Sequence, residues 1–442
     1  MASPPAPPTA PHPVDAWLPP GQLLVYGLQH VLAMYAGAVA VPLILAGALG
    51  LSRAQLVYLI GADLFTCGLA TLIQTVGFRG VGVRLPVIQG CTFAAVGPMI
   101  LIGRQGGLPA VYGAVIAAGT LTLLAAPYFA RMLRFFPPVV TGSIITLIGI
   151  SLLPVAVRWA GGGDPSSTDF GAPSALGLSF ATFGLVLLYK RVLRGFWQGV
   201  GVLLGLVSGT VLAALLGRLD LGGVREAGWL AVTTPFAFGL PQFTPGAVAS
   251  MALVMVVVMV ESTGDFVALG ELTGRPLTPE ALSRGLRADG LSTMLGGVLN
   301  AFPYTAYAQN VGLVALSRVR SRWVVAAAGL ILMVLGLLPK LSALVAAIPA
   351  PVLGGAGLLM FGQVAASGLR TLARVDFDSE EGRLNGLVVG ATLAVGLIPL
   401  GSPGFWRSLP EWAQVVLQSG ITAGSLTGIV LHAVLVRGGR EG

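Results

Sequence analysis

Apolar runs of about twenty residues recur along the chain, and no other feature constrains its fold as strongly. Each run is long enough to cross the roughly 30 Å hydrocarbon layer of a bilayer as a helix. Charged residues make up 10% of the 442 residues, against about 25% in an ordinary soluble domain. A soluble protein of this length needs more polar surface, so the sequence predicts an all-α polytopic membrane protein.

We expect fourteen apolar segments, at residues 23–48, 55–77, 85–102, 109–127, 138–157, 175–189, 197–216, 246–270, 281–300, 303–317, 323–339, 350–367, 384–401 and 411–436. Residues 1–22 precede them, are rich in Pro and contain no Lys or Arg. They therefore lack the positive region of a secretory signal peptide, and we interpret them as a disordered cytoplasmic tail.

The basic residues lie at the ends of the apolar runs and not on one face. Of the 25 Lys and Arg residues, 18 fall in the termini and the even-numbered connections, and 7 fall on the opposite side. The positive-inside rule then places both termini in the cytoplasm, with the chain in the inner (cytoplasmic) membrane. The net charge of +8 is thus assigned to topology and not to nucleic-acid binding. Cys67 and Cys91 lie in apolar stretches, so no disulfide framework or metal cluster is implied.

Local patterns repeat at nearly constant offsets, which indicates a duplication. The pairs are PVVTG at 138–142 with PVLGG at 351–355, Gly201-x3-Gly205-x3-Gly209 with Gly420-x3-Gly424-x3-Gly428, and Pro86 with Pro303. Their offsets of 213, 219 and 217 would match helices of two seven-segment halves. Because seven is odd, the second half enters the membrane in the opposite sense, which is the inverted-repeat plan of secondary transporters.

Such transporters bind substrate near discontinuous helices at the repeat interface. Segments 3 and 10 are the candidates, because each opens with Pro and carries polar residues in mid-run: Gln89 and Thr92 in one, and Thr305, Gln309 and Asn310 in the other. A break there would direct helix N-termini at a polar or anionic ligand. The alternative is that these side chains hydrogen-bond neighbouring helices.

Four acids lie inside apolar segments: Asp63, Glu261, Asp265 and Asp289. An ionised carboxylate there costs at least about 2.5 kcal/mol, so these groups are candidates for a functional site. Burial disfavours the charged form of a carboxyl, which allows proton exchange when the surroundings change. Glu261 and Asp265 share a helix face, whereas Asp289 could cap a helix. His30 could relay protons or, as we favour, orient a neighbour by a hydrogen bond.

Three motifs stand out: Gln29-His30-Val31-Leu32-Ala33-Met34-Tyr35, Glu261-Ser262-Thr263-Gly264-Asp265, and Gln309-Asn310-Val311-Gly312 followed by Ser317-Arg318. They closely resemble motifs of the nucleobase–ascorbate transporter family, in its bacterial purine branch of uric acid and xanthine permeases. Their order and spacing match over nearly the whole chain beyond the tail. Ser317 replaces the usual Thr but keeps the hydroxyl.

The resemblance implies a 7+7 inverted repeat with a core and a gate domain, and short strands in segments 3 and 10. The core would comprise residues 23–127 and 246–345, and the gate residues 128–245 and 346–442 with a cytoplasmic tail. Tyr304-Thr305-Ala306-Tyr307 suits a strand better than a helix. Members are often homodimers that move the core against the gate.

The resemblance also implies roles for individual residues. Glu261 and Gln309 would hold the base, with Thr92, Phe93 and Asn310 as further substrate-binding residues. The site would be supported by Asp289, His30 and Asp265. The same three residues would take part in proton coupling together with Glu261.

The identity of the base is indicated by positions at which the family's branches differ. Uracil carriers tend to have Glu at the Gln309 position and His at the Asp265 position, so this chain resembles the purine branch. Xanthine carriers tend to have Asn at the Thr92 position and Gly at the Arg318 position. Thr92 and Arg318 therefore favour urate, which is largely a monoanion at neutral pH. Arg318 could instead be one more topogenic charge.

Other classes remain as alternatives. An intramembrane enzyme or an ATP-driven pump is disfavoured, because the chain has no HExxH, Asp-rich or GxxxxGK[ST] motif. We expect no cofactor and no metal. A uracil carrier, or an anion transporter of the same inverted-repeat fold, is the alternative to a proton-coupled purine carrier, because fold alone does not separate them.

Overall fold

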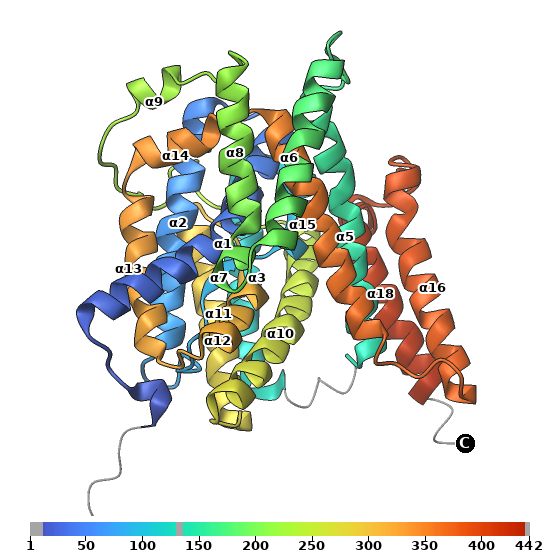
Figure 1. Ribbon diagram of the computed structural model, residues 1–442. Helices are drawn as coiled ribbons and strands as arrows, with labels where there is room; N and C mark the ends of the chain where they lie inside the picture. The colour runs from blue at the N-terminus through green and yellow to red at the C-terminus, as the bar shows by residue number, and fades with distance from the viewer. Residues whose placement is uncertain (1–11, 130–135, 438–442) are drawn as a thin grey trace, which may run out of the picture.

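The computed structural model describes residues 12–129 and 136–437 of the chain (Figure 1). Residues 1–11, where most of the expected tail falls, lie outside the described residues. Residues 12–19 are ordered and include the short helix η1 (Pro13–Asp15). They are held because the Asp15 carboxylate pairs with Arg322 Nε at 2.7 Å and with Arg275 Nη1 at 3.0 Å. The disordered tail was therefore predicted too long.

Helices make up most of the structure. The first half contains α1 (Pro20–Leu49), α2 (Arg53–Thr75), η2 (Phe93–Ala95), α3 (Val96–Ala125), η3 (Ala126–Tyr128), α5 (Pro138–Ala160), α6 (Pro173–Val192), α7 (Phe196–Gly199), α8 (Gly201–Leu215) and α9 (Gly222–Glu226). The second half contains α10 (Pro245–Thr273), α11 (Pro279–Val298), α12 (Ala308–Ser317), α13 (Arg322–Gly336), α14 (Pro339–Ala346), α15 (Ala350–Leu372), α16 (Glu380–Gly401), α17 (Glu411–Leu417), α18 (Gly420–Leu431) and η5 (His432–Arg437).

Within the described ranges, eight helices are long and apolar enough to cross a membrane. A ninth is obtained if α13 and α14, which meet at a bend of 81°, form one span. The chain is thus a multi-pass membrane protein. Fourteen crossings stay a prediction, because the other expected segments are interrupted: segments 3 and 10 each combine a strand with a helix, and α8, α12 and α18 are short. The break at Gly107, whose φ of 69° suits glycine, falls between segments 3 and 4 within the span of α3.

Two three-residue strands pair in the middle of the fold. Strand β1 (Gln89–Cys91) runs antiparallel to β2 (Tyr304–Ala306), with Gly90 opposite Thr305. Backbone bonds from Thr92 N–H to the Pro303 carbonyl and from Tyr307 N–H to the Ile88 carbonyl extend the pairing on both sides. Every strand residue is buried. The pairing satisfies backbone groups that would otherwise lack partners in a water-free interior.

Two close helix contacts of the same kind join the first half of the chain to the second. Helix α2 crosses α13 where Gly68 meets Gly329, and α11 crosses α3 where Gly290 meets Gly119. A Cβ atom on Gly329 would lie 2.9 Å from the Gly68 carbonyl oxygen, and one on Gly290 would lie 2.8 Å from that of Gly119. Small residues permit such approach in membrane proteins. Equivalent helices of the two halves therefore pack in equivalent ways.

The helices pack as two groups. Helices α1, α2, α3, α10, α11 and α13 contact one another and enclose the strand pair. Helices α5, α6, α8, α15, α16 and α18 form the second group, in which α15 crosses α5 and α16 packs on α18. Figure 1 shows α13 and α16 at opposite sides of the molecule. The strand ends thus lie where the groups face each other.

We predict that Gly68→Val destabilises the protein. Its Cβ would overlap the Gly329 carbonyl oxygen and lie 2.6 Å from Met333 Cγ, and overpacking of this kind costs about 1–3 kcal/mol. Thermal unfolding of the detergent-purified protein should show a lower Tm. Gly184→Val is the matched control, because nothing lies within 4 Å of a Cβ at that position. Equal Tm values for the two variants would contradict the assignment of the contact.

Candidate functional site

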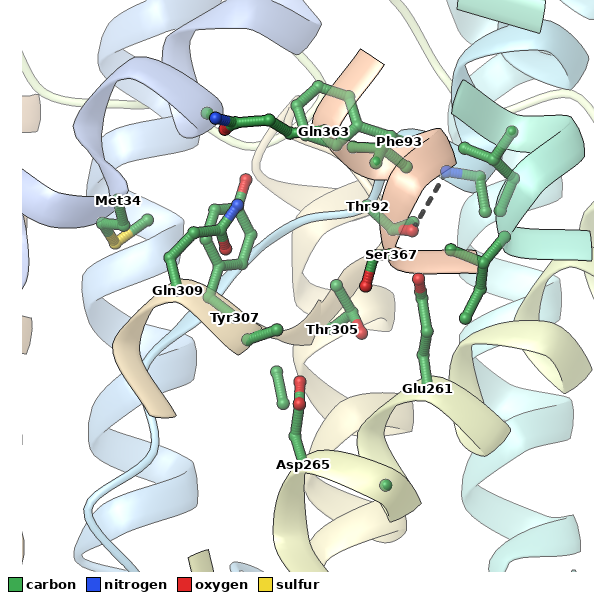
Figure 2. Close-up of a pocket in the computed structure, with 18 of the residues that line it drawn as sticks. Met34, Thr92, Phe93, Glu261, Asp265, Thr305, Tyr307, Gln309, Gln363 and Ser367 are labelled. Atoms are coloured by element: carbon green, nitrogen blue, oxygen red, sulfur yellow. Dashed lines mark hydrogen bonds between the residues drawn. The ribbon is translucent and has the colours of Figure 1, made fainter. Parts of the chain in front are cut away.

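A cavity of about 880 Å³ lies between the two helix groups. Its walls come from α1, the β1–η2 junction, α5, α6 to α8, α10, the β2–α12 junction and α15. The polar and aromatic side chains at its centre are Thr92, Phe93, Glu261, Asp265, Thr305, Tyr307, Gln309, Gln363 and Ser367 (Figure 2). Its size is that of a small-molecule site.

Helix α10 contributes two carboxyl groups to this cavity. Glu261 and Asp265 are one helical turn apart, and Figure 2 shows both side chains rising from α10 toward the strand ends. Neither carboxyl group forms a hydrogen bond or ion pair with any part of the chain that the structure describes. Both are therefore placed to accept hydrogen bonds from a bound molecule.

Each strand is followed by a helix whose N-terminus faces the cavity. After β1, Thr92 caps η2 by accepting a hydrogen bond from Ala94 N–H at 3.2 Å. After β2, α12 begins at Ala308 without a side-chain cap, and the Gln309 amide forms no hydrogen bond to a described residue. Unpaired N–H groups and the helix dipole make such an end attractive to acceptor atoms or anions.

Hydroxyl groups on the surrounding helices hold the strands in position. Thr71 of α2 accepts a hydrogen bond from Gln89 N–H at 3.0 Å, and Thr293 of α11 accepts one from Tyr304 N–H at 3.1 Å. Ser262 of α10, next to Glu261, accepts one from Ala306 N–H at 3.2 Å. The helix that carries the carboxylates is thus fixed directly to β2.

Asp289 lies behind the strands and does not line the cavity. Its Oδ1 accepts hydrogen bonds of 2.9 Å from both Gln74 Nε2 and Gln89 Nε2. The carboxyl group is buried and joins α11, α2 and β1. Asp289 is therefore placed in the support of the site, and it does not cap α11, which begins ten residues earlier.

His30 and Asn310 form a pair one layer away from the cavity. Asn310 Nδ2 lies 3.1 Å from His30 Nδ1 and donates to the His30 carbonyl oxygen at 3.0 Å. Both side chains are buried, and neither lines the cavity. In this structure Asn310 therefore fixes α12 against α1, and its predicted contact with a substrate stays a prediction.

Asp63 forms a second buried support. Tyr304 Oη donates to Asp63 Oδ1 at 2.9 Å, and Cys67 Sγ lies 3.8 Å from Oδ2. Asp63 is fully buried and joins α2 to β2. Asp63 does not line the cavity, so its position is that of a structural support and not of a contact with a bound molecule.

Helix α15 forms a wall that the sequence did not single out. Gln363, Ser367, Arg370, Thr371 and Arg374 all line the cavity. The spacing of Gln363, Ser367 and Arg370 places them on one face of α15, Thr371 lies next to Arg370, and Arg374 lies in the turn that follows the helix. This polar stripe is visible in the sequence, but it ends at the membrane boundary and resembles an ordinary helix end. Phe361 of the same helix meets Phe93 edge-on, with ring centroids 5.9 Å apart.

Arg318 lies away from these walls. It ends α12 with a left-handed φ of 58°, is exposed, and does not line the cavity. A role in substrate choice would act through its field and not by contact, and it stays a prediction.

The cavity thus offers two carboxyl groups, two side-chain amides, aromatic rings and two helix N-termini, which suit a small planar molecule with N–H and C=O groups. Among the described residues, no group of three or more His, Cys, Asp or Glu side chains is arranged to hold a metal ion.

Sequence comparison assigns the family. The model of the permease family, Xan_ur_permease, matches residues 21–403. The chain belongs to this permease family. It is 48% identical to the uric acid transporter UacT of Escherichia coli (strain K12) over 422 residues, which cover 95% of this chain and 87% of that protein. The identity is 49% to the uric acid permease PucK of Bacillus subtilis over 412 residues, covering 93% and 95%. It is 46% to the xanthine permease of B. subtilis over 414 residues, covering 94% of each.

These relatives confirm the resemblance to uric acid and xanthine permeases. They also confirm the prediction that the protein is a transporter and not an enzyme. Among solved structures, the transmembrane domain of the cyanobacterial bicarbonate transporter BicA is similar, with a TM-score of 0.60 at 16% identity over 93% of this permease and 97% of that chain. Murine Slc26a9, an anion transporter, gives a TM-score of 0.63 at 13% identity over 94% and 68%. At such identities the likeness concerns the fold alone.

We predict that Asp289→Ala destabilises the permease more than Asp289→Asn. Alanine removes the acceptor of two buried amide donors, and each unsatisfied group costs about 1–3 kcal/mol. Asparagine keeps one carboxamide oxygen at the Oδ1 position. Thermal unfolding of the purified variants measures the difference. An alanine variant that melts with the native protein would show that the amides find other partners.

Proposed function

We propose that this permease takes up a purine base across the cytoplasmic membrane in symport with protons, with urate as the favoured base and xanthine next. The observation that carries the proposal is the cavity in which Glu261 and Gln309 lie together at the strand ends. The names of the relatives support the purine class. Uracil, another nucleobase or a different anion is the alternative substrate.

The side chains suit a purine in a definite way. The carbonyl oxygen of the Glu261 carboxyl group would accept a hydrogen bond from a ring N–H group, and the Gln309 amide would both donate and accept along the base's edge. Thr92 and Phe93 would close over the ring at the η2 terminus. His30 and Asn310 would position Gln309, and Asp289 would position β1.

Proton coupling would use the carboxyl groups of α10. A protonated Glu261 removes one negative charge from a cavity that receives a largely anionic base, so proton and urate favour each other's binding. Asp265, one turn away, would add a second negative charge that strengthens this preference. Binding and release would then follow the proton gradient.

Alternating access would move the first helix group, as core, against the second, as gate. The contacts within each group support this division. The cavity reaches the exposed residues Arg370 and Arg374, whereas Phe93 and buried Phe361 meet at the other end. With the basic end in the cytoplasm, the structure would correspond to an inward-facing state. Both termini would be cytoplasmic, membrane lipid would surround the helices, and, by the family resemblance, two copies would form a homodimer.

The substrate is tested by uptake of labelled urate, xanthine and uracil in cells that lack their own carriers. We expect urate uptake that excess xanthine inhibits weakly. Thr92→Asn should shift the preference toward xanthine, since Thr leaves more room for the additional urate carbonyl, and Arg318→Gly should do the same through the lost positive field. A native permease that ignores urate would leave xanthine as the substrate, and uptake of uracil alone would reject the purine proposal.

The coupling role of Glu261 is tested by Glu261→Gln, which keeps size and hydrogen bonding but cannot titrate. We expect accumulation driven by a pH gradient to vanish while exchange of base across the membrane persists. Glu271→Gln, an exposed change on the same helix outside the cavity, is the control. Accumulation against a gradient in the Glu261 variant would remove the coupling role.

The role of Gln309 is tested by Gln309→Glu. The ionised acid loses the amide donor, so purine uptake should fall at least about tenfold, which corresponds to roughly 1.4 kcal/mol. The matched control is Gln22→Glu, an exposed change in the first turn of α1. Uptake and selectivity equal to those of the control would place Gln309 outside the site.

A further inference from the structure

We propose that Lys190, Arg370 and Arg374 form an anion subsite in the mouth of the cavity, which holds the purine as a monoanion between the base site and the cytoplasm. This inference rests on the proposed function. The three residues line the same cavity as Glu261, Gln309 and Thr92. Lys190 belongs to α6 and Arg370 to α15, and Arg374 lies in the turn after α15; both helices are in the second helix group, whereas Glu261, Gln309 and Thr92 lie on elements of the first.

The two arginines extend the polar stripe of α15. Gln363, Ser367, Arg370 and Arg374 follow one another at spacings of three or four residues and all line the cavity. A molecule that leaves the base site past Gln363 and Ser367 therefore meets the arginines next. Both arginines are exposed, so they stand where the cavity opens to solvent.

Lys190 approaches the same space from α6. It is half-buried, and its aliphatic carbons lie beside Gly201, within 3.4–3.6 Å of where a Cβ atom of that glycine would stand. Lysine commonly buries its stem in this manner while its ammonium group stays in water. A Cβ atom at position 201 would make ordinary van der Waals contact with this stem. The side chain is thus held along the cavity wall.

These three cations have no acidic partner among the described residues. Among the described residues, ion pairs join Arg53 to Asp220, and Asp15 to both Arg275 and Arg322. Arg370 lies in the last turn of α15 and Arg374 in the turn that follows it, so two like charges lie close in sequence at this end of the helix. An unpaired cluster of this kind favours a ligand that brings negative charge.

The charges that line the cavity also define the ligand. Lys190, Arg370 and Arg374 face the same space as the carboxyl groups of Glu261 and Asp265. Two carboxylates alone would repel an anionic base, whereas three cations outweigh them and attract it. A neutral base would gain little from them. The subsite therefore selects the anionic form of the purine.

A phospholipid headgroup is also anionic, but a headgroup tethered to its lipid could not move along the cavity wall to Gln363 and Glu261. Arginines and lysines that only set the membrane orientation would not need to line a cavity. The cluster lies on a wall continuous with the base site, and this position favours the transported anion over a lipid headgroup and over a purely topogenic role.

The test uses the full-length purified permease in liposomes of zwitterionic lipid, with counterflow of labelled urate and xanthine. The pH is one at which urate is mainly a monoanion and xanthine mainly neutral. Arg370→Gln, Arg374→Gln and Lys190→Gln are each expected to raise the apparent KM for urate about fivefold and that for xanthine less than twofold. Added salt should weaken urate transport by the native protein more than by the Arg370→Gln/Arg374→Gln double variant.

Two controls separate charge from folding and topology. Arg370→Lys keeps the charge and should keep the native ratio of urate to xanthine. Arg191→Gln removes an exposed charge beside Lys190 that does not line the cavity, and it should leave both substrates unchanged. Xanthine counterflow shows that each variant is folded. If the double variant no longer exchanges xanthine, the two single variants, Arg370→Gln and Arg374→Gln, are used in its place.

The outcomes are distinct. An unchanged urate-to-xanthine ratio in variants that still transport xanthine overturns the subsite while the proposed function stands. A urate KM that follows the content of anionic phospholipid and ignores the substitutions also overturns it, in favour of a headgroup site. A native permease that exchanges neither purine rejects the proposed function itself.

Discussion

The pairing of β1 with β2 is the constraint on which the rest of the structure depends. In a water-free interior every backbone N–H and C=O group needs a partner, and two short extended segments meet that need by pairing with each other. Helices η2 and α12 begin directly after the strands, with N-caps at Thr92 and Tyr307, and so two helix N-termini face one cavity. The site exists because both segments are interrupted at the same place.

Around the strands, buried polar side chains take the role that water has at a soluble site. Thr71, Ser262 and Thr293 accept hydrogen bonds from strand N–H groups, and Asp289 accepts two from glutamine amides. Buried groups of this kind are costly unless paired, so the network fixes the strands in one position. Glu261 and Asp265 differ in having no partner among the described residues, which supports the proposal that they act on a bound molecule.

The sequence predicts part of this arrangement for physical reasons. Intramembrane charge is costly, so Glu261 and Asp265 stand out, and Pro86 and Pro303 mark the interrupted segments. The pairing of His30 with Asn310, or of Gln74 with Asp289, could not be read from the chain, because it joins residues hundreds of positions apart. The α15 wall with Gln363 was missed since a polar stripe near a helix end is common. Asp15 was assigned to a disordered tail because its arginine partners are equally distant in sequence.

The antiparallel ladder has a consequence for biosynthesis. Strand β1 pairs with a strand more than two hundred residues later in the chain, so its hydrogen-bonding groups lack their final partners until β2 has been synthesised. Contacts of such sequence separation form late, and the first half of the protein must wait in the membrane with its central segment unpaired. Completion of the cavity is therefore coupled to synthesis of the second half of the chain, because residues of both halves line it.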